Sequence, residues 1–134
     1  MQLKTRTLGQ VTIVDIRGKI TIGKADVVLR PTLFQFLDSD RRQILLNLDE
    51  TTYVDSCGLS ELIVCYRRAR QHNGTIKLLK PRERVRDLLR ITRLDQVLEI
   101  YTDEDAALAS FGRRAGKEEG LAALLLPRPT PFLI

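Results

Sequence analysis

The sequence predicts an α/β fold: a single domain with a mixed sheet of four to five strands and about four helices. Two observations support this prediction. Short aliphatic or alternating segments, typical of strands, take turns along the chain with segments whose apolar residues recur at helical spacing. Near the start, a glycine turn also joins two short strands into a hairpin, so one strand pair is antiparallel. At 134 residues, the chain suits one domain with a modest core.

The amino-terminal third is predicted to contain a hairpin, a loop and one helix. The hairpin turns at Gly9-Gln10, and the loop has a glycine at each end. Pro31 opposes a helix interior because it lacks an N–H donor, so we expect the helix to begin near Leu29–Arg30 or to kink. In order, the two strands, the loop and the helix occupy residues 3–8, 11–17, 18–23 and 26–37.

The following elements alternate regularly between strand and helix. The pair Asn73-Gly74 ends the longest helix, since both residues tolerate the left-handed conformation found at helix C-termini. The predicted elements are a strand at 44–48, a helix at 55–72, a strand at 75–79, a helix at 81–91, a strand at 97–101 and a helix at 103–111. Residues 112–134 break the pattern with a short apolar run and three prolines, which predicts a disordered or loosely docked tail.

Composition excludes several classes of function. No apolar run approaches the ~20 residues of a membrane span, and the first residues do not resemble a secretory signal, so we expect a cytoplasmic protein. The two cysteines, Cys57 and Cys65, lie about 12 Å apart along one predicted helix, too far for a disulfide. With a single histidine, His72, no zinc pattern is present, and we expect neither a metal nor another cofactor.

The net charge of +5 raises the question of a nucleic-acid partner. Arginines cluster at residues 67–70 and 82–86, but no aromatic residues are interleaved with them and no groove-reading motif is present. We therefore interpret these clusters as solvated helix faces and expect no direct nucleic-acid binding. An acidic protein partner is the alternative use for these arginines.

The most informative segment is Tyr-Val-Asp-Ser-Cys-Gly-Leu at residues 53–59. It opens an amphipathic helix, so Asp55 or Ser56 caps a terminus at which four backbone N–H groups lack partners. A hydroxyl held there is exposed, and a phosphate on it would add roughly −1.5 to −2 charges. The alternative is a purely structural capping serine. One histidine provides no Ser-His-Asp set, so we expect Ser56 to be a substrate rather than a nucleophile and the chain not to be an enzyme.

The segment Asp55-Ser56-Cys57-Gly58-Leu59 resembles the core motif of STAS-domain anti-sigma factor antagonists, which is Asp-Ser-(Ser/Thr)-Gly-(Leu/Ile). The resemblance continues through the strand at 74–79 and a helix at 85–94 that is similar to one ending in Thr-Gly-Leu. It covers residues 3–111, so we assign residues 1–111 to a STAS domain and 112–134 to the tail. Cys57 departs from the pattern because a second hydroxyl residue is usual there. Arg93 departs as well, since it replaces the usual glycine before Leu94.

The resemblance implies a partner-switching function. In that family, the first serine of the motif is phosphorylated by a partner that is both an anti-sigma factor and a serine kinase, and a serine phosphatase resets the cycle. The resemblance thus implies that Ser56 is the phosphoacceptor and that Asp55 shapes the turn. Gly58 would allow close approach of the partner, or would permit helix–sheet packing instead.

The helical spacing adds a docking patch to this picture. At about 100° per residue, Val64 falls on the outer face near the Cys57 and Ser60 side chains. With Asp55 and Gly58, which the resemblance implies, the predicted partner-binding residues are Asp55, Cys57, Gly58, Ser60 and Val64. The predicted sheet-facing residues are Leu59, Leu62, Ile63, Tyr66 and Ala69. Two other functions are open: a scaffold or regulatory subunit in a signalling or lipid-transport assembly, and a module that binds a nucleotide or small anion at the helix N-terminus.

Overall fold

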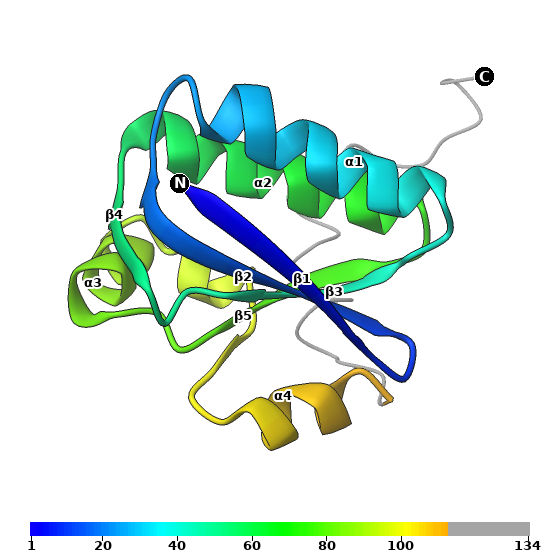
Figure 1. Cartoon of the computed structure of the whole chain (residues 1–134). Coiled ribbons are helices and arrows are strands. Elements are labelled where there is room, and N and C mark those ends of the chain that lie inside the picture. Colours follow the sequence, from blue (N-terminus) through cyan, green and yellow to red (C-terminus); the bar gives the residue numbers. More distant parts are fainter. Residues whose placement is uncertain (113–134) are drawn as a thin grey trace, which may run out of the picture.

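A six-stranded mixed sheet organises the chain, and helices cover both of its faces (Figure 1). The computed structural model describes residues 1–112. The strands are β1 (Gln2–Leu8), β2 (Val11–Ile20), β3 (Gln43–Asn47), β4 (Thr51–Val54), β5 (Thr75–Leu79) and β6 (Ile100–Tyr101). The helices are α1 (Arg30–Asp38), α2 (Ser56–Gln71), α3 (Glu83–Ile91) and α4 (Glu104–Ser110), with a π-helical turn η1 (Ala25–Leu29) and a 3₁₀ turn η2 (Leu94–Gln96).

The long strand β2 determines where the candidate site lies. The strand order is β1-β2-β3-β5-β6, with β1 antiparallel to β2 and the other pairs parallel. The first half of β2 pairs with β3, whereas its last residues, Gly18 to Ile20, pair with β4. The carboxyl ends of β2 and β4 therefore lie side by side, and the segments that follow these two strands leave the sheet at the same edge.

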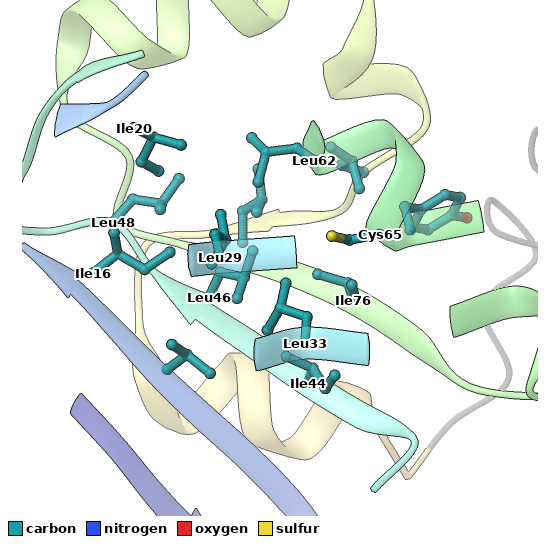
Figure 2. Close-up of a cluster of buried hydrophobic side chains, with 14 of the residues drawn as sticks. Ile16, Ile20, Leu29, Leu33, Ile44, Leu46, Leu48, Leu62, Cys65 and Ile76 are labelled. Carbon is teal, nitrogen blue, oxygen red and sulfur yellow. The ribbon is translucent and has the colours of Figure 1, made fainter. Parts of the chain in front are cut away.

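The main core lies between the sheet and the helix pair α1–α2, which covers one face (Figures 1 and 2). Aliphatic side chains from the central strands pack there against both helices and exclude water, the dominant stabilising contribution to such a fold. Figure 2 labels Ile16, Ile20, Leu29, Leu33, Ile44, Leu46, Leu48, Leu62, Cys65 and Ile76 within this cluster. The order of elements and the buried faces together place the start of α2 above the end of β2.

The opposite face of the sheet carries α4 and a smaller apolar cluster (Figure 1). Lys77, on β5, is buried in this layer with 1% of its surface exposed. Its ammonium group donates hydrogen bonds to the backbone oxygen and hydroxyl of Ser110, at 3.2 and 3.0 Å, and lies 3.5 Å from the Glu99 carboxylate. Because a cation is favourable at a helix C-terminus, these contacts anchor the end of α4 to the sheet.

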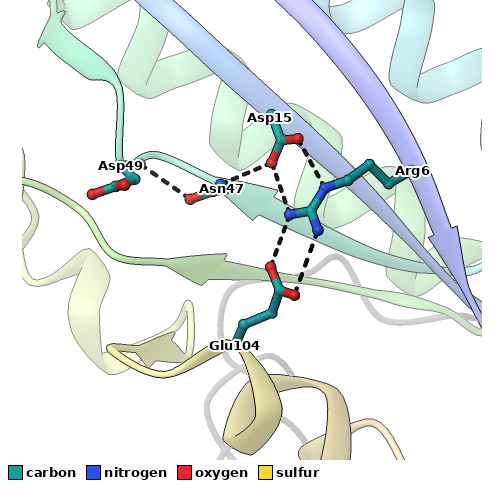
Figure 3. Close-up of polar contacts among 5 residues, drawn as sticks. All are labelled: Arg6, Asp15, Asn47, Asp49 and Glu104. Atoms are coloured by element: carbon teal, nitrogen blue, oxygen red, sulfur yellow. Dashed lines mark hydrogen bonds and ion pairs between the residues drawn. The ribbon is translucent and has the colours of Figure 1, made fainter.

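A polar network secures the start of α4 on the same face (Figure 3). The Arg6 guanidinium donates to both oxygens of Asp15, at 2.9 and 3.0 Å, and to Glu104, at 2.8 Å. Asn47 donates to Asp15 at 2.8 Å. Partial burial opposes ionisation of Asp15, but the hydrogen bonds from Arg6 and Asn47 outweigh it and lower the pKa of this carboxyl. The network therefore links β1, β2, β3 and α4.

The predicted fold class is confirmed, and most elements lie where the sequence placed them. The helix expected to start late because of Pro31 does so: α1 begins at Arg30, which places Pro31 in its first turn, and the π-helical turn η1 precedes it directly. Asn73 adopts the left-handed conformation expected after α2, with a φ of 61°. The tail predicted for residues 112–134 lies, apart from Gly112, outside the described residues.

Two sequence predictions were wrong in detail, and one strand was missed. Residues 18–20, predicted as loop, extend β2, because Gly18 accommodates a register shift at a φ of 99° and allows pairing with β4. The predicted strand at 97–101 is reduced to Ile100–Tyr101, as only these residues pair with β5. The strand β4 was not predicted as a separate element.

Candidate functional site: an exposed serine at the start of α2

Asp55 caps α2 and ties it to a second segment of the chain. One carboxylate oxygen accepts the Gly58 backbone N–H at 2.7 Å, and the other accepts the N–H of Ile22 at 3.0 Å. The Asp55 backbone N–H itself donates to the Ile20 carbonyl at 3.2 Å. The carboxylate thus fixes the start of α2 and the loop after β2 in one arrangement.

These hydrogen bonds also keep Asp55 ionised. The N–H groups of Gly58 and Ile22 lower the pKa of the Asp55 carboxyl below its usual value because they favour its charged form. A negative charge at a helix N-terminus is further favoured by the helix dipole. The site therefore carries a fixed negative charge before any modification.

Ser56 occupies the first helical position and is exposed. Because Asp55 provides the cap, the Ser56 side chain is not needed for this purpose, and it has no hydrogen bond within residues 1–112. The choice left open between Asp55 and Ser56 as the cap is thus resolved in favour of Asp55. A hydroxyl in this position is accessible to a modifying enzyme without unfolding of the helix.

Gly58 is buried against the end of β2. A Cβ atom at this position would lie 2.1 Å from the Ile20 carbonyl oxygen, far closer than atoms can approach. The geometry therefore supports the packing interpretation of Gly58, in which the absence of a side chain lets α2 start directly above β2.

The cysteines of α2 are protonated thiols. Cys57 is half-buried, and desolvation, followed by the nearby carboxylates of Asp26 and Asp55, raises its pKa. Cys65 is buried, and desolvation raises its pKa to about 12. Although a helix N-terminus usually favours a thiolate, burial and neighbouring acids prevail at Cys57.

The outer face of α2 differs from the predicted one. Ser60 is exposed as expected, while Val64 is half-buried. Leu59 and Ile63, predicted to face the sheet, are only half-buried, whereas Cys65 is fully buried. The residues of α2 that are buried are Gly58, Glu61, Leu62, Cys65, Tyr66 and Ala69. The buried face is rotated because α1 packs along the flank of α2, and Arg30 lies 3.5 Å from Glu61 there.

Sequence reasoning did not identify the apolar surface beside Ser56. Ile22, whose N–H is bound by Asp55, is 71% exposed, and Val27 in η1 is 64% exposed. Isolated exposed apolar residues are ordinary, but here one is bound to the cap that precedes Ser56, and the other belongs to η1, which contacts α2. The sequence signal was weak, because these residues lie in an irregular loop and a π-helical turn. π-Helical turns often occur at functional sites.

Neither a catalytic set nor a metal site forms among the described residues. His72, the single histidine of the chain, caps the far end of α2, about 24 Å along the helix from Ser56. Within residues 1–112 no three side chains of His, Cys, Asp or Glu gather so that they could hold a metal ion. In the same range, no helix is long and apolar enough to cross a membrane.

Comparison with known proteins places this arrangement in a family. The STAS domain family model matches residues 2–107. A Thermotoga neapolitana protein, provisionally described as an anti-sigma factor antagonist, is 29% identical over 98 residues, which are 73% of this chain and 87% of the relative. A Thermotoga maritima crystal structure with the same provisional description has a TM-score of 0.78 at 23% identity and covers 83% of this chain and 95% of its own.

A further structural relative is the Bacillus cell fate determinant SpoIIAA, solved in its phosphorylated form. It matches with a TM-score of 0.64 at 15% identity, covering 81% of this chain and 98% of its own. At these identities the structural matches establish the fold alone. The family model, by contrast, spans most of the chain, including the segment from Asp55 to Leu59. The chain belongs to the STAS domain family.

Proposed function

We propose that this protein is an anti-sigma factor antagonist that binds a serine kinase acting as anti-sigma factor, and that phosphorylation of Ser56 ends this binding. The observation that carries the proposal is the exposed Ser56 hydroxyl on a helix start that Asp55 already caps. The descriptions of the relatives and the existence of a phosphorylated form of SpoIIAA support the same function. A serine phosphatase would restore the binding-competent form in the cytoplasm.

The partner surface in this proposal surrounds Ser56. Cys57, Ser60 and Val64 contribute from α2, and the exposed Ile22 and Val27 contribute from the preceding loop and η1. Two further residues support this surface. Asp55 fixes the loop after β2, and Gly58 lets α2 start directly above the end of β2. Apolar side chains beside a modifiable hydroxyl provide contact area that a phosphate can disrupt.

The switch follows from electrostatics. A phosphate on Ser56 adds roughly −1.5 to −2 charges beside the ionised Asp55, and this charge must lose water before the partner can bind again. A loss of ~3 kcal/mol of binding free energy weakens a complex more than a hundredfold. The backbone of α2 need not move, since its cap does not involve Ser56.

The same geometry disfavours a nucleotide-binding module. An anion at a helix N-terminus uses the free N–H groups and the positive end of the dipole. Here the Asp55 carboxylate already accepts the Gly58 N–H and places a negative charge at that terminus. A nucleotide phosphate would therefore be repelled. A scaffold subunit, the other alternative, would bind its partners regardless of the charge at Ser56.

The proposal is tested with purified candidate anti-sigma kinases from the same genome. Incubation with ATP followed by peptide mass spectrometry should find phosphate at Ser56 and none in the Ser56→Ala variant. Calorimetry should show binding of the wild type and of Ser56→Ala, and loss of binding for Ser56→Asp. Equal binding of Ser56→Asp would contradict the switch and favour the scaffold function.

Ser39→Asp provides the matched control. Ser39 is exposed and follows α1, at the end of the helix pair far from Ser56. Asp38 beside it lies 3.5 Å from His72, which caps the far end of α2. The same charge change there should leave binding intact. If both aspartate variants lose binding equally, the effect reflects net charge rather than the Ser56 surface.

A further inference from the structure

A polar hollow lies at the end of the molecule opposite to the start of α2, beside the turn of the β1–β2 hairpin and the loops that follow α1 and α2 (Figure 1). Its volume is about 560 Å³, which is within the range of sites for small molecules. The residues that line it are all polar or glycine, and they include Thr7, Gln10, Thr12, Arg41, Arg42 and Asn73. None of them belongs to the surface around Ser56.

Arg41 is held in position at the rim of this hollow. Asp40 before it adopts the left-handed conformation, with a φ of 65°. The Asp40 N–H donates to the Leu37 carbonyl at 3.1 Å, and the N–H of the next residue donates to the Phe36 carbonyl at 2.8 Å. This is the Schellman arrangement of a helix C-terminus, in which the residue after the left-handed one packs back on the helix. The Arg41 guanidinium does so at 5.4 Å from the centre of the Phe36 ring, and it forms no ion pair within residues 1–112.

Backbone packing holds the neighbouring wall of the hollow. A Cβ atom on Gly74 would lie only 2.2 Å from the Arg42 carbonyl oxygen, and the same oxygen accepts the Thr75 N–H at 2.9 Å. The Arg42 guanidinium pairs with the Asp40 carboxylate at 3.3 Å, and this carboxylate is the one acidic group among the lining residues. The hollow is therefore preformed, and the uncompensated charge of Arg41 makes it net positive.

A buried hydroxyl group faces this hollow. Thr12 lies opposite Thr7 in the hairpin, is only 2% exposed and lines the hollow. Its hydroxyl makes no hydrogen bond to any residue in the range 1–112. Burial of a hydroxyl without a hydrogen-bond partner is unfavourable. A ligand oxygen in the hollow would supply the missing partner.

We propose that the hollow binds a small phosphorylated sugar. Guanidinium groups form charge-assisted hydrogen bonds with phosphate, so Arg41 and Arg42 would hold the phosphate group. The amides of Gln10 and Asn73 and the hydroxyl of Thr12 both donate and accept hydrogen bonds, which suits the hydroxyl groups of a sugar. This binding does not rest on the proposed function of Ser56, because the hollow shares no residue with that surface.

Other ligands fit the hollow less well. Inorganic phosphate would pair with the guanidinium groups but leave the Gln10 and Asn73 amides to water. A nucleotide carries a base that stacks on aromatic side chains or packs on aliphatic ones, and the lining residues provide neither. A cation would be repelled by Arg41. The lining therefore favours a ligand that is anionic at one end and hydroxylated elsewhere.

The test titrates the full ¹⁵N-labelled chain with glucose 6-phosphate, and separately with glucose and with inorganic phosphate. Saturable amide shifts should appear at residues 9–12 and 40–43, and each partial ligand should bind roughly tenfold more weakly than the sugar phosphate. Arg41→Gln removes the positioned charge and should raise the Kd for glucose 6-phosphate roughly tenfold. Arg84→Gln is the matched control, because Arg84 is exposed on α3 and lies outside the hollow, and it should bind as the wild type does.

Thr12→Val separates binding from folding. It removes the unpartnered hydroxyl but keeps the shape of the side chain, so it should maintain or raise the Tm while raising the Kd several-fold. Absence of saturable shifts at the hollow, equal binding by Arg41→Gln and Arg84→Gln, or tighter binding of inorganic phosphate or AMP than of glucose 6-phosphate would each overturn the proposal. Phosphatidylglycerol vesicles present phosphate as a lipid headgroup, and tighter binding to them than to the free sugar phosphate would overturn it as well. None of these outcomes depends on the response to Ser56→Asp, so the two proposals fail separately.

Discussion

Replacing Gly58 with alanine should destabilise the domain, although alanine normally favours a helix. The added Cβ would lie 2.1 Å from the Ile20 carbonyl oxygen, about 1 Å inside the closest approach that real Cβ atoms make. Neither atom can move alone, because one belongs to the backbone of β2 and the other to the backbone of α2. The start of α2 must therefore shift away from the sheet.

The size of the effect follows from three contributions. Overpacking of this kind costs roughly 1–3 kcal/mol. The shift also weakens the hydrogen bond from the Asp55 N–H to the Ile20 carbonyl, currently 3.2 Å long, at a cost of about 1 kcal/mol. Alanine returns about 1 kcal/mol through its higher helix propensity. We therefore expect a net loss of about 2 kcal/mol in the free energy of unfolding.

Urea denaturation measures this loss directly, and thermal unfolding should show a Tm lower by roughly 6–10 °C. The control is Ser60→Ala, which makes a helix-favouring change at an exposed position one half-turn further along α2. It should leave the stability unchanged or slightly raised. A Gly58→Ala variant as stable as Ser60→Ala would refute the packing role of Gly58 and revive a direct role at the partner interface.

Three further predictions test the surrounding structure. Arg6→Met should lower stability by about 1 kcal/mol above pH 5, and the difference from wild type should shrink as the pH falls through the lowered folded pKa of Asp15, because the protonated carboxyl no longer pairs with the guanidinium; pH-dependent thermal unfolding measures this. Lys77→Met leaves the Glu99 carboxylate buried without its cation and should cost about 3 kcal/mol, with faster amide exchange in α4, whereas adding Glu99→Leu should restore most of the loss. Cys57 should react with a disulfide reagent more slowly than a free thiol at pH 8 and accelerate at higher pH, since its pKa is raised; a fast reaction at pH 7 would contradict this.

Local patterns in the sequence were sufficient to predict most elements of this fold. A cap at Asp55 or Ser56 follows from residue type, and the end of α2 follows from the conformational preferences of Asn73; the choice of Asp55 came from the structure. The hairpin of β1 and β2 and the alternation of later strands and helices are likewise local in origin. These features depend on residues within a few positions of each other, which is the range over which sequence patterns are informative.

The features that sequence did not reveal depend on distant parts of the chain. The second hydrogen bond of Asp55 joins it to Ile22, which lies 33 positions away. The burial of Cys65 depends on α1 packing along the flank of α2, and the strand β4 exists because the end of β2 extends past β3. The exposed Ile22 and Val27 lie in irregular segments, where no periodicity marks a residue as facing solvent.

At Arg93 the sequence shows a departure from the resembled pattern but does not reveal the backbone conformation that results. Arg93 stands where the resembled pattern has a glycine before Leu94. The structure places Arg93 in the left-handed conformation, which glycine adopts without strain and a residue with a Cβ does not.

The effect of the phosphate on partner binding can be measured in a single titration. The chain is phosphorylated to completion at Ser56 by its kinase, and its affinity for that kinase is compared by calorimetry with that of the unmodified chain. We expect a Kd weaker by more than a hundredfold for the phosphorylated chain, with the amide spectrum of α2 beyond its first turn unchanged. Equal affinity of the two forms would contradict it, because a dianion on Ser56 would then lie outside every surface that the partner touches.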